Sequence, residues 1–255
     1  MQLNSQQDLD SFVKAASDKG MYLVDHSNIS ALIEEFKSTI PKVDKLCEVV
    51  DPEDTPFNSK YDARKLLDEV CNKLEATRTI LVLENKKESI AEVDWRIACC
   101  RVRLGTIAWE CEEPHNTQIE LDMATDFYFP DLREKIQELS RDKEGSSKDY
   151  SNIESDLASL PKLVVSDNRR INDAMKCLNM MGILWAGREH VKESFLYLYS
   201  AKALYDYVIT ETPQISLSLR GGEVDVKALE DLYTHNLFYL AQAYGHVGQA
   251  HKSCR

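Results

Sequence analysis

The segment from Ile171 to Ile209 carries an apolar pattern with the period of an α-helix. Residues three and four positions apart lie along one face of a helix, and apolar residues there form a buried stripe. The first stripe consists of Ile171, Ala174, Met175, Leu178, Met181, Gly182 and Trp185. The second stripe follows a polar break at 187–190 and consists of Val191, Ser194, Phe195, Leu198, Ala201 and Tyr205. Two stripes separated by a short break predict a helical hairpin.

Small and large residues alternate along the two stripes. A larger side chain at Gly182, Ser194 or Ala201 would hold the helix axes apart, so these positions predict a close crossing. Large residues fill the space around the crossing, namely Leu178, Trp185 and Leu198. This alternation resembles the tetratricopeptide unit, a helical hairpin of about 34 residues.

Partial copies of the same pattern flank this hairpin. In the segment 229–255, the stripe positions are taken by Leu237, Leu240, Ala241 and Tyr244, and Gly248 stands at the expected turn. An earlier copy has Leu104-Gly105 and Trp109 on its first helix, then Thr117, Leu121 and Ala124 on its second. Any amphipathic helix pair satisfies some of this template, so the earlier copy is equally compatible with an unrelated hairpin. Together the copies predict an all-α, tetratricopeptide-like helical-hairpin solenoid.

Composition supports this fold class and limits the partners. The chain has only 9 Gly and 7 Pro in 255 residues, few for a β protein that needs many tight turns. Its 43 acidic and 31 basic residues give a net charge of −12, which disfavours binding to nucleic acid or anionic lipid. An acidic surface suits a basic protein partner, although solubility alone also explains it.

The chain shows no secretory or membrane-spanning pattern. Met1 to Asp10 is polar, and no segment offers about 18 consecutive uncharged apolar residues, so we expect no membrane insertion and a cytoplasmic location. Seven irregularly spaced cysteines fit reduced thiols packed as small apolar residues.

Further helical patterns divide the rest of the chain. We expect helices over residues 9–16, 29–43, 59–83, 90–112, 116–126, 132–139 and 153–165, with Pro41 kinking or ending the second and Pro161 breaking the last. The predicted segments are 1–58 (N-terminal helices), 59–140 (degenerate hairpins), 141–167 (linker) and 168–255 (repeats, the last truncated). Within the last segment, 211–223 reads as a long loop containing Pro213 and Gly221-Gly222.

No catalytic constellation is present. Phosphate-binding glycine motifs, HExxH and CxxC are all absent, and the neighbouring Cys99 and Cys100 would diverge on a helix. His235 and His246 lie eleven residues apart on one expected helix, too far to share a metal ion. The sequence predicts a protein that is not an enzyme and holds no metal or cofactor.

The concave surface of the repeats is the candidate binding site. Residues offset from the packing stripe of the last copy mix aromatic rings with hydrogen-bonding groups, as interface hot spots do; they are His235, Phe238, Tyr239, Gln242 and His246. The corresponding residues of the first copy are Lys176, Asn179, Met180, Ile183 and Gly187. We take the five residues of the last copy, together with Asn179 of the first copy, as candidate partner-binding residues. Alternatively, Phe238 and Tyr239 pack against a following repeat.

Three blocks of this chain resemble the KIF-binding (kinesin-binding) protein family. They are Ser59-Lys60-Tyr61-Asp62-Ala63-Arg64-Lys65-Leu66-Leu67, then Gly182-Ile183-Leu184-Trp185 with Ser200-Ala201-Lys202-Ala203-Leu204-Tyr205, and Tyr233-Thr234-His235-Asn236-Leu237-Phe238-Tyr239-Leu240-Ala241-Gln242-Ala243-Tyr244. The resemblance implies a helical solenoid that grips the motor domain of certain kinesins and keeps it off microtubules. It also implies a cytoskeletal location and a bearing on microtubule organisation and mitochondrial transport. The microtubule-binding face of a motor is basic, so an acidic solenoid can compete for it.

Two departures from the family shape the expectations. Residues 1–57 match it poorly, and the family continues well beyond Arg255, so the chain is expected to be a piece of a longer protein with Leu237, Leu240 and Tyr244 exposed. A general tetratricopeptide adaptor for peptide tails is the alternative function. Acidic tails would need Lys or Arg in the groove, and none occurs between Tyr233 and His251. Neither the kinesin nor the oligomeric state follows from the sequence.

Overall fold

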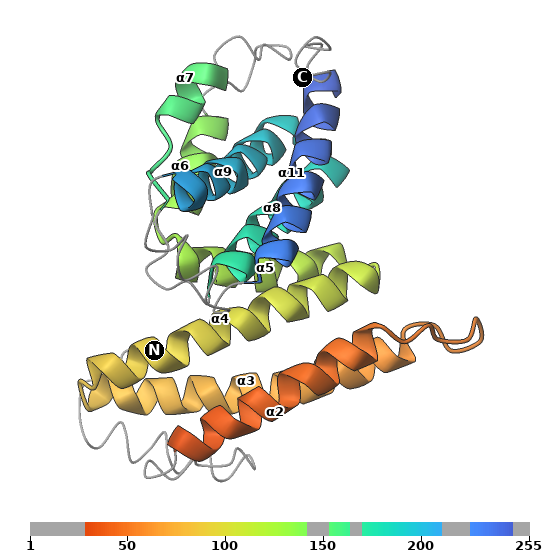
Figure 1. Ribbon diagram of the computed structural model, residues 1–255, viewed down its shortest axis with the longest axis vertical. Coiled ribbons are helices and arrows are strands. Elements are labelled where there is room, and N and C mark those ends of the chain that lie inside the picture. Colours follow the sequence, from red (N-terminus) through yellow and green to blue (C-terminus); the bar gives the residue numbers. More distant parts are fainter. Residues whose placement is uncertain (1–28, 142–152, 164–169, 211–224, 247–255) are drawn as a thin grey trace. The chain divides into compact units, whose positions relative to one another are not determined.

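The computed structural model describes residues 29–141, 153–163, 170–210 and 225–246 (Figure 1). Within these ranges the structure contains nine α-helices and no strand, which confirms the predicted all-α helical-hairpin fold. In chain order they are α2 (Ile29–Cys47), α3 (Asn58–Leu83), α4 (Lys87–Glu110), α5 (Pro114–Tyr128), α6 (Leu132–Arg141), α7 (Ile153–Ala158), α8 (Ile171–Gly187), α9 (Val191–Thr210) and α11 (Val226–His246). The predicted helix at 9–16, most of the linker, the 211–223 loop and Gly248 lie outside the described residues.

The chain forms two compact units, Met1–Ile107 and Ala108–Arg255, called unit 1 and unit 2 below. Their boundary falls near the end of α4, within the segment that the sequence assigned to degenerate hairpins. The four-part division stays a prediction.

Unit 1 is built from α2, α3 and most of α4. The Asp51 carboxylate accepts hydrogen bonds from the Ser59 backbone N–H (3.0 Å) and from Ser59 Oγ (2.6 Å), which stabilises the predicted start of α3. Phe36 and Trp95 pack edge to face at 5.6 Å and join α2 to α4. The chain thus closes a small core from three helices.

Pro41 does not end α2, contrary to one of the two sequence expectations. The helix continues through it to Cys47. Proline lacks an N–H and removes one helical hydrogen bond, which weakens a helix. Phe36 and Val43 are buried on either side of Pro41, and α2 packs against α3. Tertiary packing supplies most of the stability of a helix in a protein, so the helix persists across this site.

The predicted hairpin in unit 2 is formed by α8 and α9. Its stripes are buried except for Trp185, Val191 and Tyr205, which are partly buried. A Cβ atom at Gly182 would lie 2.5 Å from Leu198 Cγ and 3.3 Å from the Ser194 carbonyl oxygen. Only glycine allows the two helices to approach this closely, and the predicted close crossing at Gly182 is confirmed.

Helix α11 packs against both helices of this hairpin, but in a different rotation from the one predicted. It buries Leu229, Asn236, Leu240 and Ala243, whereas Leu237 is exposed. The predicted stripe is therefore wrong at Leu237. The expectation that Leu237, Leu240 and Tyr244 are all exposed is wrong for Leu240, which is buried, and for Tyr244, which is partly buried. The physical reason is that Asn236, a polar residue, faces the hairpin and makes hydrogen bonds there.

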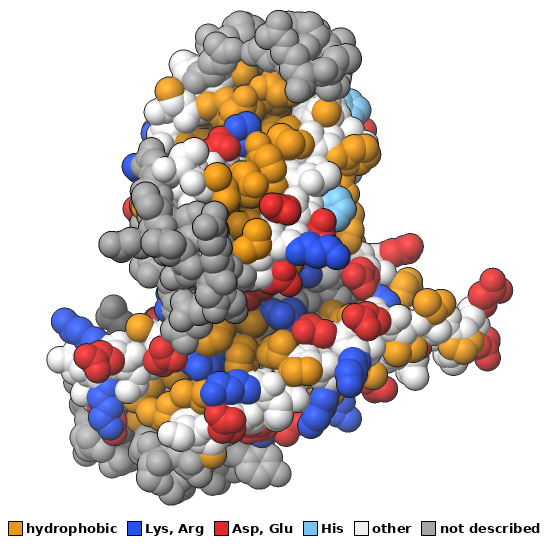
Figure 2. Space-filling model, viewed as in Figure 1, with side chains coloured by type: hydrophobic (Ala, Val, Ile, Leu, Met, Phe, Trp, Pro, Cys, Tyr) orange, Lys and Arg blue, Asp and Glu red, His pale blue; other side chains and the backbone are white. Residues whose placement is uncertain are grey.

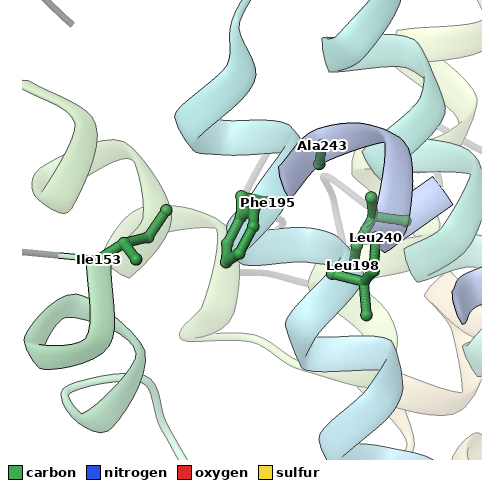
Figure 3. Packing of buried hydrophobic residues seen from close by; sticks show 5 residues of the cluster. All are labelled: Ile153, Phe195, Leu198, Leu240 and Ala243. Atoms are coloured by element: carbon green, nitrogen blue, oxygen red, sulfur yellow. The ribbon is translucent and has the colours of Figure 1, made fainter. Parts of the chain in front are cut away.

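A cluster of buried residues holds α11 in place. Figure 3 shows Ile153 of α7 opposite Phe195 of α9, with Leu198, Leu240 and Ala243 beyond it. The hydroxyl groups of Tyr199 and Tyr244 lie 2.7 Å apart at the edge of this cluster, and Tyr239 packs against it. These contacts fix the surface that α11 presents.

Helices α5 and α6 complete unit 2. Thr117, Leu121 and Ala124 of α5 are fully buried, as expected for the second helix of the earlier copy. On the α8 side, Thr125 Oγ1 lies 3.4 Å from Cys177 Sγ. Lys192 Nζ donates to the Leu139 carbonyl oxygen at 2.5 Å and ties α6 to α9. The hairpin is therefore covered on several sides by shorter helices.

Candidate functional site

Five of the six candidate partner-binding residues lie on α11. His235, Phe238, Gln242 and His246 are exposed, and Tyr239 is partly buried. Phe238 has 57% of its surface accessible. Its ring contacts that of Tyr239 edge to face, with centroids 5.4 Å apart. Phe238 therefore offers free apolar surface, while Tyr239 links this surface to the core.

The sixth candidate, Asn179, is placed differently by the structure. It is only 4% exposed, on α8. Its Nδ2 donates to the Leu232 carbonyl oxygen at 2.9 Å, and its Oδ1 accepts from Asn236 Nδ2 at 2.8 Å. Asn236 Nδ2 also donates to the Leu198 carbonyl oxygen at 2.8 Å. Asn179 thus joins α8 to α11 inside the protein and presents no group to a partner.

Three candidates come together in one cavity. Tyr239, Gln242 and His246 line a cavity of about 350 Å³ between α8, the start of α9 and the end of α11. Its other lining residues are Gly182, Ile183, Ala186, Glu189, Val191, Ser194, Leu198 and Ala243. His235 and Phe238 are not among them. The sequence predicted three of the α11 residues that line this cavity, and it also singled out Ile183. It did not predict the lining residues of α9.

The floor of the cavity is apolar and rigid. Leu198 and Ala243 belong to the buried cluster of Figure 3. Gly182, which allows the close helix crossing, lines the same cavity. Side chains locked in a packed core keep their positions when a ligand arrives, which lowers the entropic cost of binding. The cavity is therefore largely preformed.

Polar groups surround this floor. Glu189, in the turn between α8 and α9, adopts the left-handed backbone conformation with φ of 64°. Its backbone N–H donates to the Ala186 carbonyl oxygen at 3.0 Å, which holds the turn. No described residue forms an ion pair with its exposed carboxylate. Ser194 is 1% exposed, and its Oγ has no hydrogen-bond partner within the described ranges. Both Glu189 and Ser194 have unused hydrogen-bonding capacity.

The surface around the cavity is rich in apolar atoms. Figure 2 shows hydrophobic side chains gathered over α9 and α11, with histidine side chains at the edge of this area. Leu237 and Phe238 are the exposed large apolar residues of α11. Aromatic and apolar groups next to a polar rim are typical of protein interfaces. The arrangement is suited to binding rather than to bond-breaking chemistry.

The described residues offer no metal site, because nowhere do three or more His, Cys, Asp or Glu side chains converge in metal-binding geometry. Burial raises the pKa of the Cys177 thiol to about 12. The Cys100 thiol also has a raised pKa, through a hydrogen bond with Cys71 and through burial. Thiols kept neutral in this way are poor nucleophiles. In the described part of the chain, no helix has the length and apolar character needed to cross a membrane.

The described helices define an all-α protein built from helical hairpins. Curated relatives of this chain are named KIF-binding protein. The relative from Gallus gallus is 27% identical over 238 residues, which cover 89% of this chain and 33% of that protein. The relative from Bos taurus is 28% identical over 214 residues, which cover 79% of this chain and 32% of that protein. The relative from Homo sapiens is 33% identical over 93 residues, which cover 32% of this chain and 15% of that protein.

These matches show that the chain is related to the KIF-binding protein family, as the resemblance predicted. The chain spans about a third of the length of the curated relatives that it matches most broadly. No protein-family model matches the chain, and no solved structure matches it either.

Proposed function

We propose that this chain is part of a non-enzymatic scaffold that binds a kinesin motor domain through α11 and blocks its attachment to microtubules. The observation that carries the proposal is the exposed aromatic and polar face of α11 beside a preformed cavity, in a chain related to proteins named for KIF binding. Aromatic residues anchored on a rigid base dominate the energetics of protein interfaces.

Charge complementarity supports the choice of partner. The chain has a net charge of −12, and a motor domain binds acidic tubulin through a basic face. A scaffold that covers this face would prevent microtubule binding by steric and electrostatic occlusion. Such a scaffold would act in the cytoplasm, at the cytoskeleton, without a cofactor.

A general adaptor for acidic peptide tails is less well supported. The described residues that line the cavity include Glu189 and no Lys or Arg. A carboxylate there would repel an acidic peptide tail.

Co-sedimentation of kinesin motor domains with microtubules, with and without this chain, tests the proposal. We expect the wild-type chain to shift at least one motor to the supernatant. Tyr239→Ala and Gln242→Ala should weaken this effect about tenfold, because each removes a group at the cavity. Matched controls are Tyr61→Ala on α3 and Gln137→Ala on α6, because both residues are exposed and neither lines the cavity. If every motor stays on the microtubules, or if the controls weaken the effect equally, the proposal is wrong.

A further inference from the structure

The cavity between α8, α9 and α11 has an acceptor-rich rim. Glu189, Tyr239 and Gln242 can each accept a hydrogen bond there; the described lining residues include His246 and no Lys or Arg. The Glu189 carboxylate forms no ion pair with a described residue. The nearby Glu193 differs, because its carboxylate oxygen lies 3.2 Å from His190 Nδ1. Glu189 is the one acidic residue among the described lining residues, and its carboxylate is therefore available to an external cation.

The interior of the cavity suits an aliphatic chain with a polar end. Ile183, Val191 and Leu198 supply apolar wall. Ser194 also lines the cavity, and its Oγ is buried without a partner among the described residues. A volume of about 350 Å³ is small for a drug-sized ligand and sufficient for one long side chain.

We infer that this cavity receives an arginine side chain of a partner protein, with the methylene groups against the apolar wall and the guanidinium group among Glu189, Gln242 and Tyr239. Guanidinium donates up to five hydrogen bonds in a plane and stacks on aromatic rings, which matches several acceptors beside the Tyr239 ring. An ammonium group is a compact charge and would use fewer of these acceptors. This inference takes one point from the proposed function, namely that the partner is a protein.

The test uses single blocked amino acids as probes, so it does not require a kinesin. The full chain, labelled with ¹⁵N, is titrated with N-acetyl-arginine amide and followed by NMR. We expect saturable shifts at the amides of Glu189, Tyr239 and Gln242. N-acetyl-citrulline amide has a similar shape without the charge and should bind about fivefold or more weakly. N-acetyl-norleucine amide should bind more weakly still.

Variants of the cavity sharpen the result. Glu189→Gln should weaken the arginine probe about fivefold, whereas Glu193→Gln removes the same charge outside the lining and should leave its affinity unchanged. A larger effect of Glu193→Gln than of Glu189→Gln would overturn the inference.

Four other outcomes would also overturn it. They are no saturable shift with N-acetyl-arginine amide, equal binding of N-acetyl-norleucine amide, equal binding of N-acetyl-lysine amide as a fourth probe, and much tighter binding of free, unblocked arginine, which would indicate a metabolite site. Failure of the motor experiment does not affect this result. If arginine binds and no motor is released, the cavity serves a different protein and the proposed function alone is wrong.

Discussion

The polar contacts between the helices of unit 1 differ from those between α8, α9 and α11 of unit 2, although unit 2 also has an ion pair between helices, Lys192 to Asp156 at 2.8 Å. In unit 1, ion pairs join neighbouring helices: Lys73 to Glu35 at 2.6 Å, Arg101 to Glu75 at 2.5 Å, Arg78 to Asp94 at 2.5 Å and Arg103 to Asp44 at 3.2 Å. In unit 2, the contacts between α8, α9 and α11 are mainly neutral. They comprise the close crossing at Gly182, the amides of Asn179 and Asn236, and the buried cluster around Phe195.

The two kinds of contact differ in how much stability is lost when a substitution disturbs them. Partly exposed ion pairs contribute about 0–1 kcal/mol each and weaken with salt. Close packing and buried hydrogen bonds cost several times more when disturbed. In Figure 2, acidic and basic side chains are interspersed over unit 1, and hydrophobic side chains gather over α9 and α11. A cavity that must keep its shape is better placed in the region held by close packing.

The strongest test of this comparison is Gly182→Ala. The new Cβ would overlap Leu198 Cγ, and the two helices must separate. We expect a loss of about 3 kcal/mol in the free energy of unfolding, measured by urea denaturation with circular dichroism. Gly245→Ala is the matched control, because nothing lies within 4 Å of a Cβ there. It should stabilise α11 by up to about 1 kcal/mol. Equal effects of both substitutions would show that the crossing is not close.

Asn236→Ala tests the buried amides of unit 2. The substitution leaves the Leu198 carbonyl oxygen and Asn179 Oδ1 without this donor. We expect a loss of about 2 kcal/mol, and faster hydrogen exchange in α11 by mass spectrometry. Gln242→Ala removes an exposed amide from the same helix and should change stability by less than about 0.5 kcal/mol. A neutral Asn236→Ala variant would mean that apolar packing alone positions α11.

Cys177 makes the stability of unit 2 depend on pH. Its thiol has a pKa of about 12 when folded against 9.0 as the unperturbed value, and burial is the main cause. Between these values the unfolded chain loses the proton first, so stability falls as pH rises. From pH 9 to about pH 10, the wild type should lose roughly 1 kcal/mol more than Cys177→Ala. Parallel stability curves of the two proteins would show that this thiol is not buried.

The smallest expected effect is that of Glu75→Gln in unit 1. The Glu75 side chain is 40% exposed, and Arg101 is its partner. We expect a loss of about 0.5 kcal/mol at low salt that disappears in about 1 M salt, because exposed pairs are screened. The Gly182→Ala effect should persist at the same salt concentration. A salt-independent loss above about 2 kcal/mol would show that this ion pair stabilises unit 1 as a buried interaction does, and would contradict the comparison.

Much of the fold was readable from the sequence because it depends on local periodicity. The stripes of α8 and α9 predicted the hairpin and its close crossing, and the patterns around Leu66 and Leu121 predicted α3 and α5. The candidate site was readable in part: Tyr239, Gln242 and His246 line one cavity. Glu189 and Ser194 were missed because each looks like an ordinary turn or crossing residue until the α9 side of the cavity is seen.

The errors have one common origin, which is contact between residues far apart in the chain. Asn179 and Asn236 are 57 positions apart, and nothing near either one reveals that their amides pair inside the protein. Their hydrogen bonds fix the rotation of α11 and expose Leu237. Helix α2 likewise continues through Pro41, where it packs against α3. The sequence by itself determined which segments are helices and which faces are apolar, because helical periodicity is a local property. Only the tertiary structure decided how α11 is rotated and where a cavity opens, because buried polar pairs and close packing join distant residues.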